Sequence, residues 1–345
     1  MNRTGIVRCL LAAVFFGASA PAASVLATDM PALLLAGLLY LGAAAAVAPA
    51  VIANPPTALA VRSSWGPVAV AVVAGGALGP VLLVAGLARI DAASASILLN
   101  LELAATVALA ATLFHEHLGG QLLAGAGLVT AAGALLVWEP GAQLSVGALL
   151  IVGACACWGL DNCVTARIDH LAPEHVVAAK GVVAGSVNLA LGLTIASRST
   201  AFTVADVGAA LAIGAVGYGL SITLWVKGAR DLGAARGQVI FATAPFIGAA
   251  IAWTVLDDPV TAAQIAAVAV AAAGVALSLR SAHEHRHRHE PLRHDHEHTH
   301  DDAHHTHAHA DGFVGRHSHP HEHVELVHSH PHVPDLHHRH THDET

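Results

Sequence analysis

The sequence VGALLIVGACACWGLDNCVTA, residues 146–166, decides the class of fold. It is apolar, and it has the length that a helix needs to cross the roughly 30 Å hydrocarbon core of a bilayer. It nevertheless contains Asp161 and Asn162, and polar groups in a membrane-spanning helix usually face other helices or a water-filled space. The stretch therefore predicts a membrane-spanning helix whose polar residues face the inside of a helical bundle.

The same pattern recurs along the chain, which is 55% hydrophobic and 12% charged. This balance is typical of an all-α integral membrane protein and lies outside the usual range of soluble domains. The ten candidate spans are approximately residues 6–27, 31–52, 66–87, 92–113, 118–138, 146–166, 174–196, 205–227, 234–256 and 260–281.

The sequence also repeats itself, because residues of the first half match residues 142 positions later in the second half. The matched positions are Phe16-Gly17 with Trp158-Gly159, Pro31 with Pro173, Gly75 with Gly217, Gly86 with Gly228, Ala92-Ala93 with Ala234-Ala235, and Glu116 with Asp258. Because each half holds five spans, the second half enters the membrane upside down relative to the first, as in many secondary transporters. We therefore expect two inverted five-helix repeats, residues 1–144 and 145–282, and a tail, residues 283–345.

The first span has a second interpretation, as a cleavable signal peptide. Arg3 and Arg8 precede or enter an apolar run that contains the small-residue sequence Ala18-Ser19-Ala20, which fits a cleavage site. The repeat favours a retained span, because it makes the first span the counterpart of the sixth.

Basic residues in the short links indicate the orientation. With the amino terminus inside, the inner side collects Arg3, Arg8, Arg62, Arg167, Lys227, Arg230, Arg236 and Arg280, whereas the outer side holds Arg89 and Arg198. Since Lys and Arg concentrate in cytoplasmic links, we expect a multi-pass protein of the cytoplasmic (inner) membrane with both termini in the cytoplasm.

A few polar side chains inside the spans are the candidates for a central substrate or coupling cavity. They are Asn100, Glu102, Asp161, Asn162, Lys180, Tyr218 and Ser221. Glu102 and Asp161 are suited to binding a cation or a proton, and Lys180 is suited to pairing with one of them or to holding an anionic substrate. The alternative is a buried pair of lysine and carboxylate that only locks the bundle.

Small residues and prolines predict how some spans pack. Gly181 and Gly185 form a face that allows another helix to approach closely. Pro80 and Pro245 remove backbone donors within the third and ninth spans, which either opens a kink beside the cavity or shapes the bundle.

Other functional classes find little support in the sequence. The acidic net charge of −8 does not suit nucleic acid. We expect no enzyme and no required cofactor, because we find no glycine-rich phosphate loop, no Gly-x-Ser-x-Gly motif and no transmembrane His-Glu-x-x-His motif. The histidines that precede the tail, His115, His117, His170 and His175, lie in links or at span ends, which argues against a site for bare transition metals at the bilayer midplane.

Several short motifs together resemble the EamA-type permeases of the drug/metabolite transporter superfamily. They are Gly86-Leu87-Ala88-Arg89, Asn100-Leu101-Glu102, Trp158-Gly159-Leu160-Asp161-Asn162, Lys180-Gly181, Ala184-Gly185, Tyr218-Gly219-Leu220-Ser221, Ala234-Ala235-Arg236 and Ala244-Pro245-Phe246. The resemblance covers roughly residues 6–281 and implies a ten-helix carrier built from two inverted repeats. It is strongest to a bacterial subgroup with a histidine-rich cytoplasmic extension.

In that subgroup, Glu102, Asp161, Asn162 and Lys180 match characteristic polar positions, which implies a role in the transport path. The sequence departs from many members in the second span, where Leu38-Leu39-Tyr40 stands in the region of a charged residue. Substrates across the superfamily include amino acids, drugs, nucleotide sugars and other metabolites, so the resemblance implies a class of protein and leaves the substrate open.

The tail, residues 283–345, holds 23 of the 27 histidines, with twelve acidic and five basic side chains. Few apolar residues mean no packed core, so we expect a largely disordered segment in the absence of a ligand. His-x-His places both rings on one side of an extended chain, which suits Zn(II), Ni(II), Co(II) or Cu(II). The candidate metal ligands are His294, His296, His298, His300, His317, His319, His321 and His323.

The sequence thus predicts a secondary-active transporter of a small metabolite, working by alternating access in the lipid bilayer, with a tail that binds transition metals for regulation or buffering. The tail also suits pH sensing, since imidazoles titrate near pH 6.5. Two alternatives stay open: a carrier of transition metal ions or their complexes, and a membrane-anchored metal buffer or sensor without transport. The sequence is compatible with a homodimer.

Overall fold

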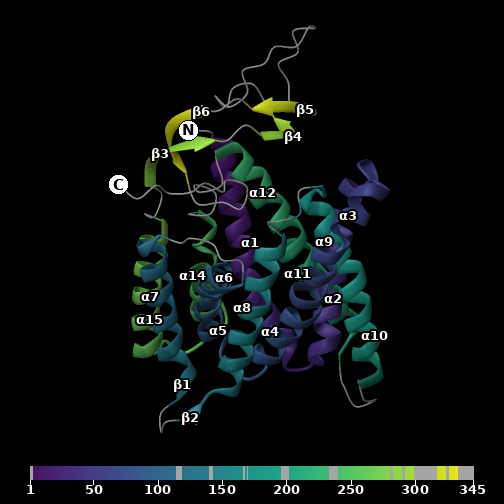
Figure 1. Cartoon of the computed structure of the whole chain (residues 1–345). Helices are drawn as coiled ribbons and strands as arrows, with labels where there is room; N and C mark the ends of the chain where they lie inside the picture. The colour runs from purple at the N-terminus through teal and green to yellow at the C-terminus, as the bar shows by residue number, and fades with distance from the viewer. Residues whose placement is uncertain are drawn as a thin grey trace. The chain divides into compact units, whose positions relative to one another are not determined.

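Apolar helices follow one another from Arg3 to Leu279 (Figure 1). The structure, a computed structural model, describes residues 3–113, 119–139, 143–165, 168, 170–195, 202–232, 240–279, 283–289, 292–298, 317–323 and 326–332. Within these ranges, seven helices are long and apolar enough to cross a membrane, and three shorter apolar helices accompany them. Together they occupy the positions of the ten spans that the sequence predicts.

The first half contains five spans, two of which are interrupted. Its elements are α1 (Arg3–Ala27), α2 (Ala32–Ala53), α3 (Ala58–Ala71), the π-helix η1 (Val72–Leu78), α4 (Gly79–Leu87), α5 (Ala92–Leu98), α6 (Leu101–Thr112) and α7 (Gly120–Val137). The segments α3, η1 and α4 form the third span, and α5 and α6 form the fourth. A two-stranded hairpin of β1 (Trp138–Glu139) and β2 (Gln143–Leu144) follows α7.

The second half repeats this order. Its elements are α8 (Val146–Thr165), α9 (Pro173–Ala179), η2 (Lys180–Ala184), α10 (Gly185–Ile195), α11 (Val204–Gly214), η3 (Ala215–Leu220), α12 (Ser221–Leu232), α14 (Ala244–Val255) and α15 (Ala262–Leu279). The offset that places Gly75 on Gly217 also places residues 73–78 of η1 on η3, so the same π-helical stretch occurs in the third span of each half.

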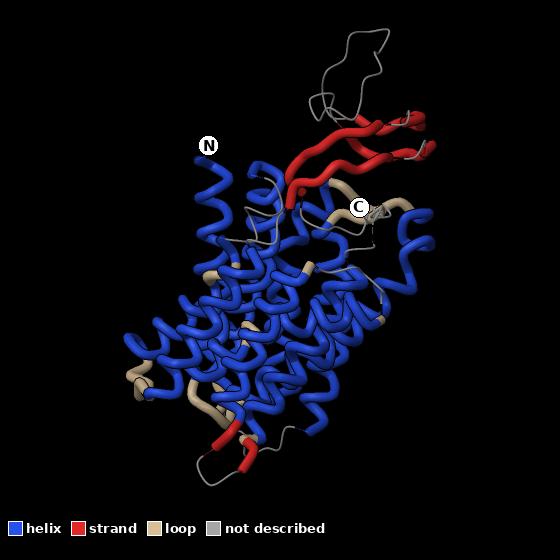
Figure 2. Tube along the Cα trace, turned by 60° about the vertical axis from the view of Figure 1, so that its left-hand side comes forward, coloured by secondary structure: helices blue, strands red, loops and turns tan. Residues whose placement is uncertain are grey.

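The helices run side by side along one common direction (Figure 2). The segments α7 and α15 pack together at one side of the bundle, and α2 packs on α10 at the other, with α6 and α8 between them (Figure 1). The predicted glycine face of the seventh span is confirmed, because a Cβ on Gly181 or Gly185 would meet the backbone of α2 at Tyr40 or Leu41.

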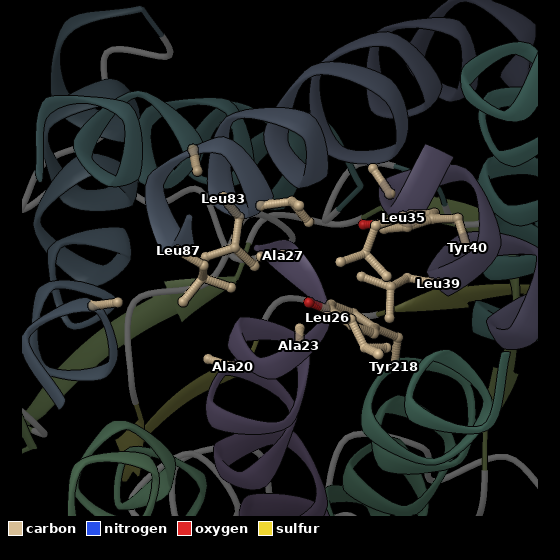
Figure 3. Packing of buried hydrophobic residues seen from close by; sticks show 14 of the residues in the cluster. Ala20, Ala23, Leu26, Ala27, Leu35, Leu39, Tyr40, Leu83, Leu87 and Tyr218 are labelled. Carbon is tan, nitrogen blue, oxygen red and sulfur yellow. The ribbon is translucent and has the colours of Figure 1, made fainter. Parts of the chain in front are cut away.

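The main apolar core joins both halves. It gathers Leu35, Leu39 and Tyr40 of α2 with Tyr218 of η3 (Figure 3). The first span belongs to this core, since Ala20 and Ala23 are buried in it and α1 packs on α12 and α14. This packing supports the interpretation of α1 as a retained span.

Close contacts at glycines reproduce the repeat in three dimensions. A Cβ on Gly86 would meet Ile151 and the carbonyl of Gly147, and a Cβ on its counterpart Gly228 would meet Cys9 and the carbonyl of Gly5. The same offset that relates Gly86 to Gly228 places Cys9 on Ile151 and Gly5 on Gly147. The two halves therefore exchange equivalent contacts across their interface, as expected for inverted repeats.

The tail forms a separate unit, Ala282–Thr345. Its described residues form two antiparallel ladders, one of β3 (His283–His289) with β6 (Leu326–His332) and one of β4 (Leu292–His298) with β5 (His317–His323). The alternating His-x-His pattern has the period of two that a β-strand requires.

Candidate functional site

Two glycines of η1 bring three spans together. A Cβ on Gly75 would overlap the side chain of Asp161 in α8, and a Cβ on Gly76 would lie 3.2 Å from the Cβ of Lys180 in η2. The absence of side chains at both positions lets the sixth and seventh spans lie directly against the third. A π-helical stretch of this kind often marks a functional site.

Asp161 and Lys180 form an ion pair at this contact. The Nζ of Lys180 lies 2.5 Å from Oδ2 of Asp161, and the two side chains are 12% and 7% exposed. The other carboxylate oxygen of Asp161, Oδ1, accepts a hydrogen bond from Thr165 at 3.0 Å. Of the two partners that the sequence offers for Lys180, the structure selects Asp161.

The carbonyl of Gly75 is held by side chains from two other spans. Within η1 the N–H of Gly79 donates to the carbonyl of Ala74, five residues earlier. By the same spacing, Gly75 would accept from residue 80, but Pro80 has no N–H. The hydroxyl of Tyr40 donates to this carbonyl at 2.6 Å and the indole N–H of Trp158 donates at 3.1 Å.

A second polar pair lies where the fourth span is interrupted. The helix breaks at Leu99 and Asn100, between α5 and α6, and Glu102 lies in the first turn of α6. The amide nitrogen of Asn162 donates to Oε1 of Glu102 at 2.8 Å and to the hydroxyl of Thr106 at 3.3 Å. Thr106 in turn donates to the backbone carbonyl of Glu102.

A close approach of helices positions this pair. A Cβ on Gly159 would lie 2.9 Å from the backbone nitrogen of Thr106 and 3.0 Å from the Cβ of Ala105, so α8 lies directly against α6. Since Asn162 follows Gly159 by three residues, its side chain reaches the first turn of α6. In the second half, a turn at Ala242 and Thr243 precedes α14, close to the equivalent position of the ninth span. Interrupted helices in corresponding positions of two inverted repeats indicate the binding region in transporters.

Asn162 is exposed on the side of α8 that faces away from the apolar surface. Val146 and Leu149 are 63% and 44% exposed. An open apolar groove of ≈ 550 Å³, lined by Val70 and Val73 of the third span and by Leu160 of α8, continues this surface. Asn162 lies about 200° around the helix from Leu160. Its exposed amide therefore points away from the surface suited to lipid.

The remaining candidates lie at different distances from this centre. Asn100 is buried at the break and donates to the carbonyl of Ile97 at 2.9 Å. Tyr218 packs against Tyr40, with ring centroids 5.7 Å apart. Ser221 is not part of the cluster, because its hydroxyl donates to the carbonyl of Ala12 in α1 at 2.9 Å.

None of the three charged residues of the cluster has a charged counterpart in the other repeat. The offset between the repeats places Ser19 on Asp161, Leu38 on Lys180 and Ala244 on Glu102. A Cβ on Gly217 would meet Ser19, as a Cβ on Gly75 would meet Asp161. The scaffold is therefore shared, and the chemistry differs between the halves.

The predicted metal ligands lie in the tail. His294, His296 and His298 of β4 are in register with His321, His319 and His317 of β5, and His323 ends β5 opposite Leu292. His300 lies outside the described residues. Among the side chains that the structure describes, no group of three His, Cys, Asp or Glu is close enough to share a metal ion.

Sequence reasoning missed three parts of the site. Tyr40 and Trp158 act through the carbonyl of Gly75, and Thr106 links Glu102 to Asn162. The sequence contained two signals for the contact of Tyr40 and Trp158 with Gly75. Gly75 matches Gly217 in the repeat, and Pro80 lacks the N–H that would otherwise donate to the carbonyl of Gly75.

Known proteins agree with this architecture. The family model described as "EamA-like transporter family" matches residues 3–138 and again residues 145–280. A solved crystal structure matches this chain with a TM-score of 0.58 and 20% sequence identity, and the match covers 81% of this chain and 97% of that one. At that identity the likeness shows the fold alone. No curated protein matches the chain significantly. Because the family model matches both halves, this chain belongs to the EamA-like transporter family of multi-pass membrane proteins.

Proposed function

We propose that the protein is a secondary-active transporter that moves a small polar metabolite by alternating access, with Glu102, Asp161, Asn162 and Lys180 on the transport path. The observation that carries this proposal is the convergence of two polar pairs, Asp161 with Lys180 and Glu102 with Asn162, on neighbouring positions of α8. Charged groups at membrane depth are costly unless they are paired or reach a wet cavity.

The arrangement suits a carrier. The cluster draws Glu102 from the first half and Asp161, Asn162 and Lys180 from the second, so a relative movement of the halves changes the contacts between them. A carboxylate, an ammonium group and an amide in one place offer complementary contacts to a small polar molecule. Interrupted helices supply further backbone groups for binding.

The experiment that tests this function starts from a ligand screen. The purified full chain is screened by thermal shift against amino acids, nucleosides, free transition metals and metal chelates. Compounds that stabilise the protein are then assayed by counterflow of the labelled compound in proteoliposomes. Asp161→Ala and Glu102→Ala are expected to abolish flux while membrane insertion is retained.

The matched control is Thr194→Ala, whose exposed hydroxyl donates locally to the carbonyl of Leu191 within α10. This variant is expected to transport normally. Normal flux in both the Asp161 and the Glu102 variants would contradict the proposed path.

The histidine-rich tail favours a second candidate function, transport of a transition metal ion or of its complex with a small organic ligand. In both ladders, histidines stand opposite histidines, for example His285 opposite His330 and His296 opposite His319. We propose that the tail binds Zn(II), Ni(II), Co(II) or Cu(II) and either regulates the carrier or buffers the metal. A metal-tolerance assay that compares the full chain with one ending at Ser281 separates these roles from a membrane-anchored buffer without transport.

We also propose that the protein resides in the cytoplasmic membrane with both termini in the cytoplasm, from the distribution of basic links in the sequence. Protease digestion of the tail in inside-out vesicles, and its protection in intact cells, tests this orientation. A homodimer is tested by mass measurement of the purified protein in nanodiscs.

A further inference from the structure

We infer that Glu102 is the proton site of the carrier, beside the ion pair of Asp161 and Lys180. This inference rests on the proposed function, and it adds the driving ion. It starts from the distribution of charge in the cluster, which holds two carboxylates, Glu102 and Asp161, and one ammonium group, Lys180.

The ammonium group of Lys180 pairs with Asp161 and not with Glu102. Among the described residues, Lys180 is within salt-bridge distance of Asp161, and Glu102 has no basic side chain within that distance. Within the described part of the chain, Glu102 receives one neutral hydrogen bond from a side chain, that of Asn162. An ionised Glu102 would therefore give the cluster an uncompensated negative charge at membrane depth, and binding of one proton removes that charge.

Among the described residues, no second compensating charge lies near Glu102. The described titratable groups that interact electrostatically with Glu102 are Asp161 and Cys155 of α8, Lys180 of η2, Tyr40 of α2 and Tyr218 of η3. The helix α7, which also packs on α6, has no ionisable side chain. Tyrosine and cysteine are neutral at physiological pH, so Lys180 is the one cation in this set.

Two features also allow the proton to leave. Glu102 lies in the first turn of α6, where the dipole of the helix favours a negative charge. Its partner Asn162 is on an exposed face of α8, which gives the pair a connection to water. Glu102 can thus be neutral when the site is closed and ionised when the site is open to water.

The geometry favours a proton over a sodium ion. A sodium site needs several oxygen ligands directed at one point, as hard cations do in general. Here the amide nitrogen of Asn162 donates to Oε1 of Glu102 and to Oγ1 of Thr106 and occupies the space between these two oxygens.

Infrared difference spectroscopy of the full-length protein in lipid vesicles tests the inference without any substrate. The carbonyl band of a protonated carboxylic acid is expected at neutral pH in the wild type, to be lost as pH rises, and to be absent in Glu102→Gln. Asp206→Asn, at the exposed start of α11, is the matched control and should keep the band.

A band of unchanged intensity in Glu102→Gln, or no band in the wild type at neutral pH, would overturn the inference. Loss of the band on replacing potassium by sodium would also overturn it, because sodium would then occupy the site. The proposed function can fail separately, since normal counterflow in the Glu102 and Asp161 variants contradicts transport through this cluster even where the band behaves as expected.

Discussion

The Nζ of Lys180 lies 2.5 Å from Oδ2 of Asp161 and ties the seventh span to the sixth. The carboxylate rests on Gly75 of the third span, where there is no side chain to displace it. In the first half, the equivalent positions hold Leu38 and Ser19. One half therefore carries a charge pair on a scaffold that the other half repeats without charge.

Removing one partner of this ion pair should lower the free energy of unfolding by more than removing both partners. Asp161→Asn or Lys180→Met alone leaves one buried charge without its partner, which typically costs about 3–5 kcal/mol. The double variant removes both charges and should cost less than the sum of the two single variants. The free energy of unfolding in mixed micelles, measured as a double-mutant cycle, checks this, and additive costs would show that the pair does not couple.

Gly75→Ala should displace Asp161, because the new Cβ would overlap its side chain. Overpacking of this kind typically costs about 1–3 kcal/mol. The matched control is Gly66→Ala in the same span, where a Cβ meets nothing within 4 Å. The control should unfold at the same or a higher temperature than the wild type, since alanine favours a helix over glycine by about 1 kcal/mol. Equal effects of the two substitutions would contradict the contact.

Tyr40→Phe and Trp158→Phe should each lower the stability of the protein only slightly, because the carbonyl of Gly75 keeps the hydrogen bond from the other donor. A hydrogen bond is worth about 0.5–1.5 kcal/mol net, whereas an unsatisfied buried group costs about 1–3 kcal/mol. The double variant should therefore be destabilised by more than the sum. Adding Pro80→Ala supplies the missing N–H and should restore part of the loss in thermal stability. No restoration would argue against the role given to Pro80.

The tail should bind the metal ions, and its affinity for them should decrease as the pH is lowered. The full chain is expected to release heat on titration with Zn(II) or Ni(II), and a chain that ends at Ser281 should not. A protonated imidazole is not a ligand, so affinity should be present above the histidine pKa of about 6.5 and lost as pH falls below it. Equal heats for both chains would place the metal elsewhere.

The sequence predicted the ten spans and their repeat because both depend on patterns along the chain. Apolar length defines a span, and Gly86 and Gly228 mark the same close contact in each half. Asp161 and Lys180 were identifiable as polar residues in apolar surroundings. The family match confirms the two-repeat transporter architecture.

The partners inside the site could not be predicted in the same way. Glu102 and Asn162 are 60 residues apart in sequence, and their contact depends on how far α8 slides along α6 at Gly159. From the sequence, Ser221 was a candidate for the cavity. In the structure α1 and α12 pack so closely that its hydroxyl donates to the carbonyl of Ala12. The break at Asn100 and the turn at Thr243 contain no glycine or proline, so the sequence did not predict them.

In this account Asn162 of α8 faces water, and the opposite side of the helix faces lipid. Cysteine accessibility tests it most directly, in a chain whose four native cysteines are replaced by alanine. Asn162→Cys should react rapidly with a water-soluble maleimide in membranes, and Leu160→Cys, on the apolar groove, should not. A reactive residue 160 with an unreactive residue 162 would contradict the account.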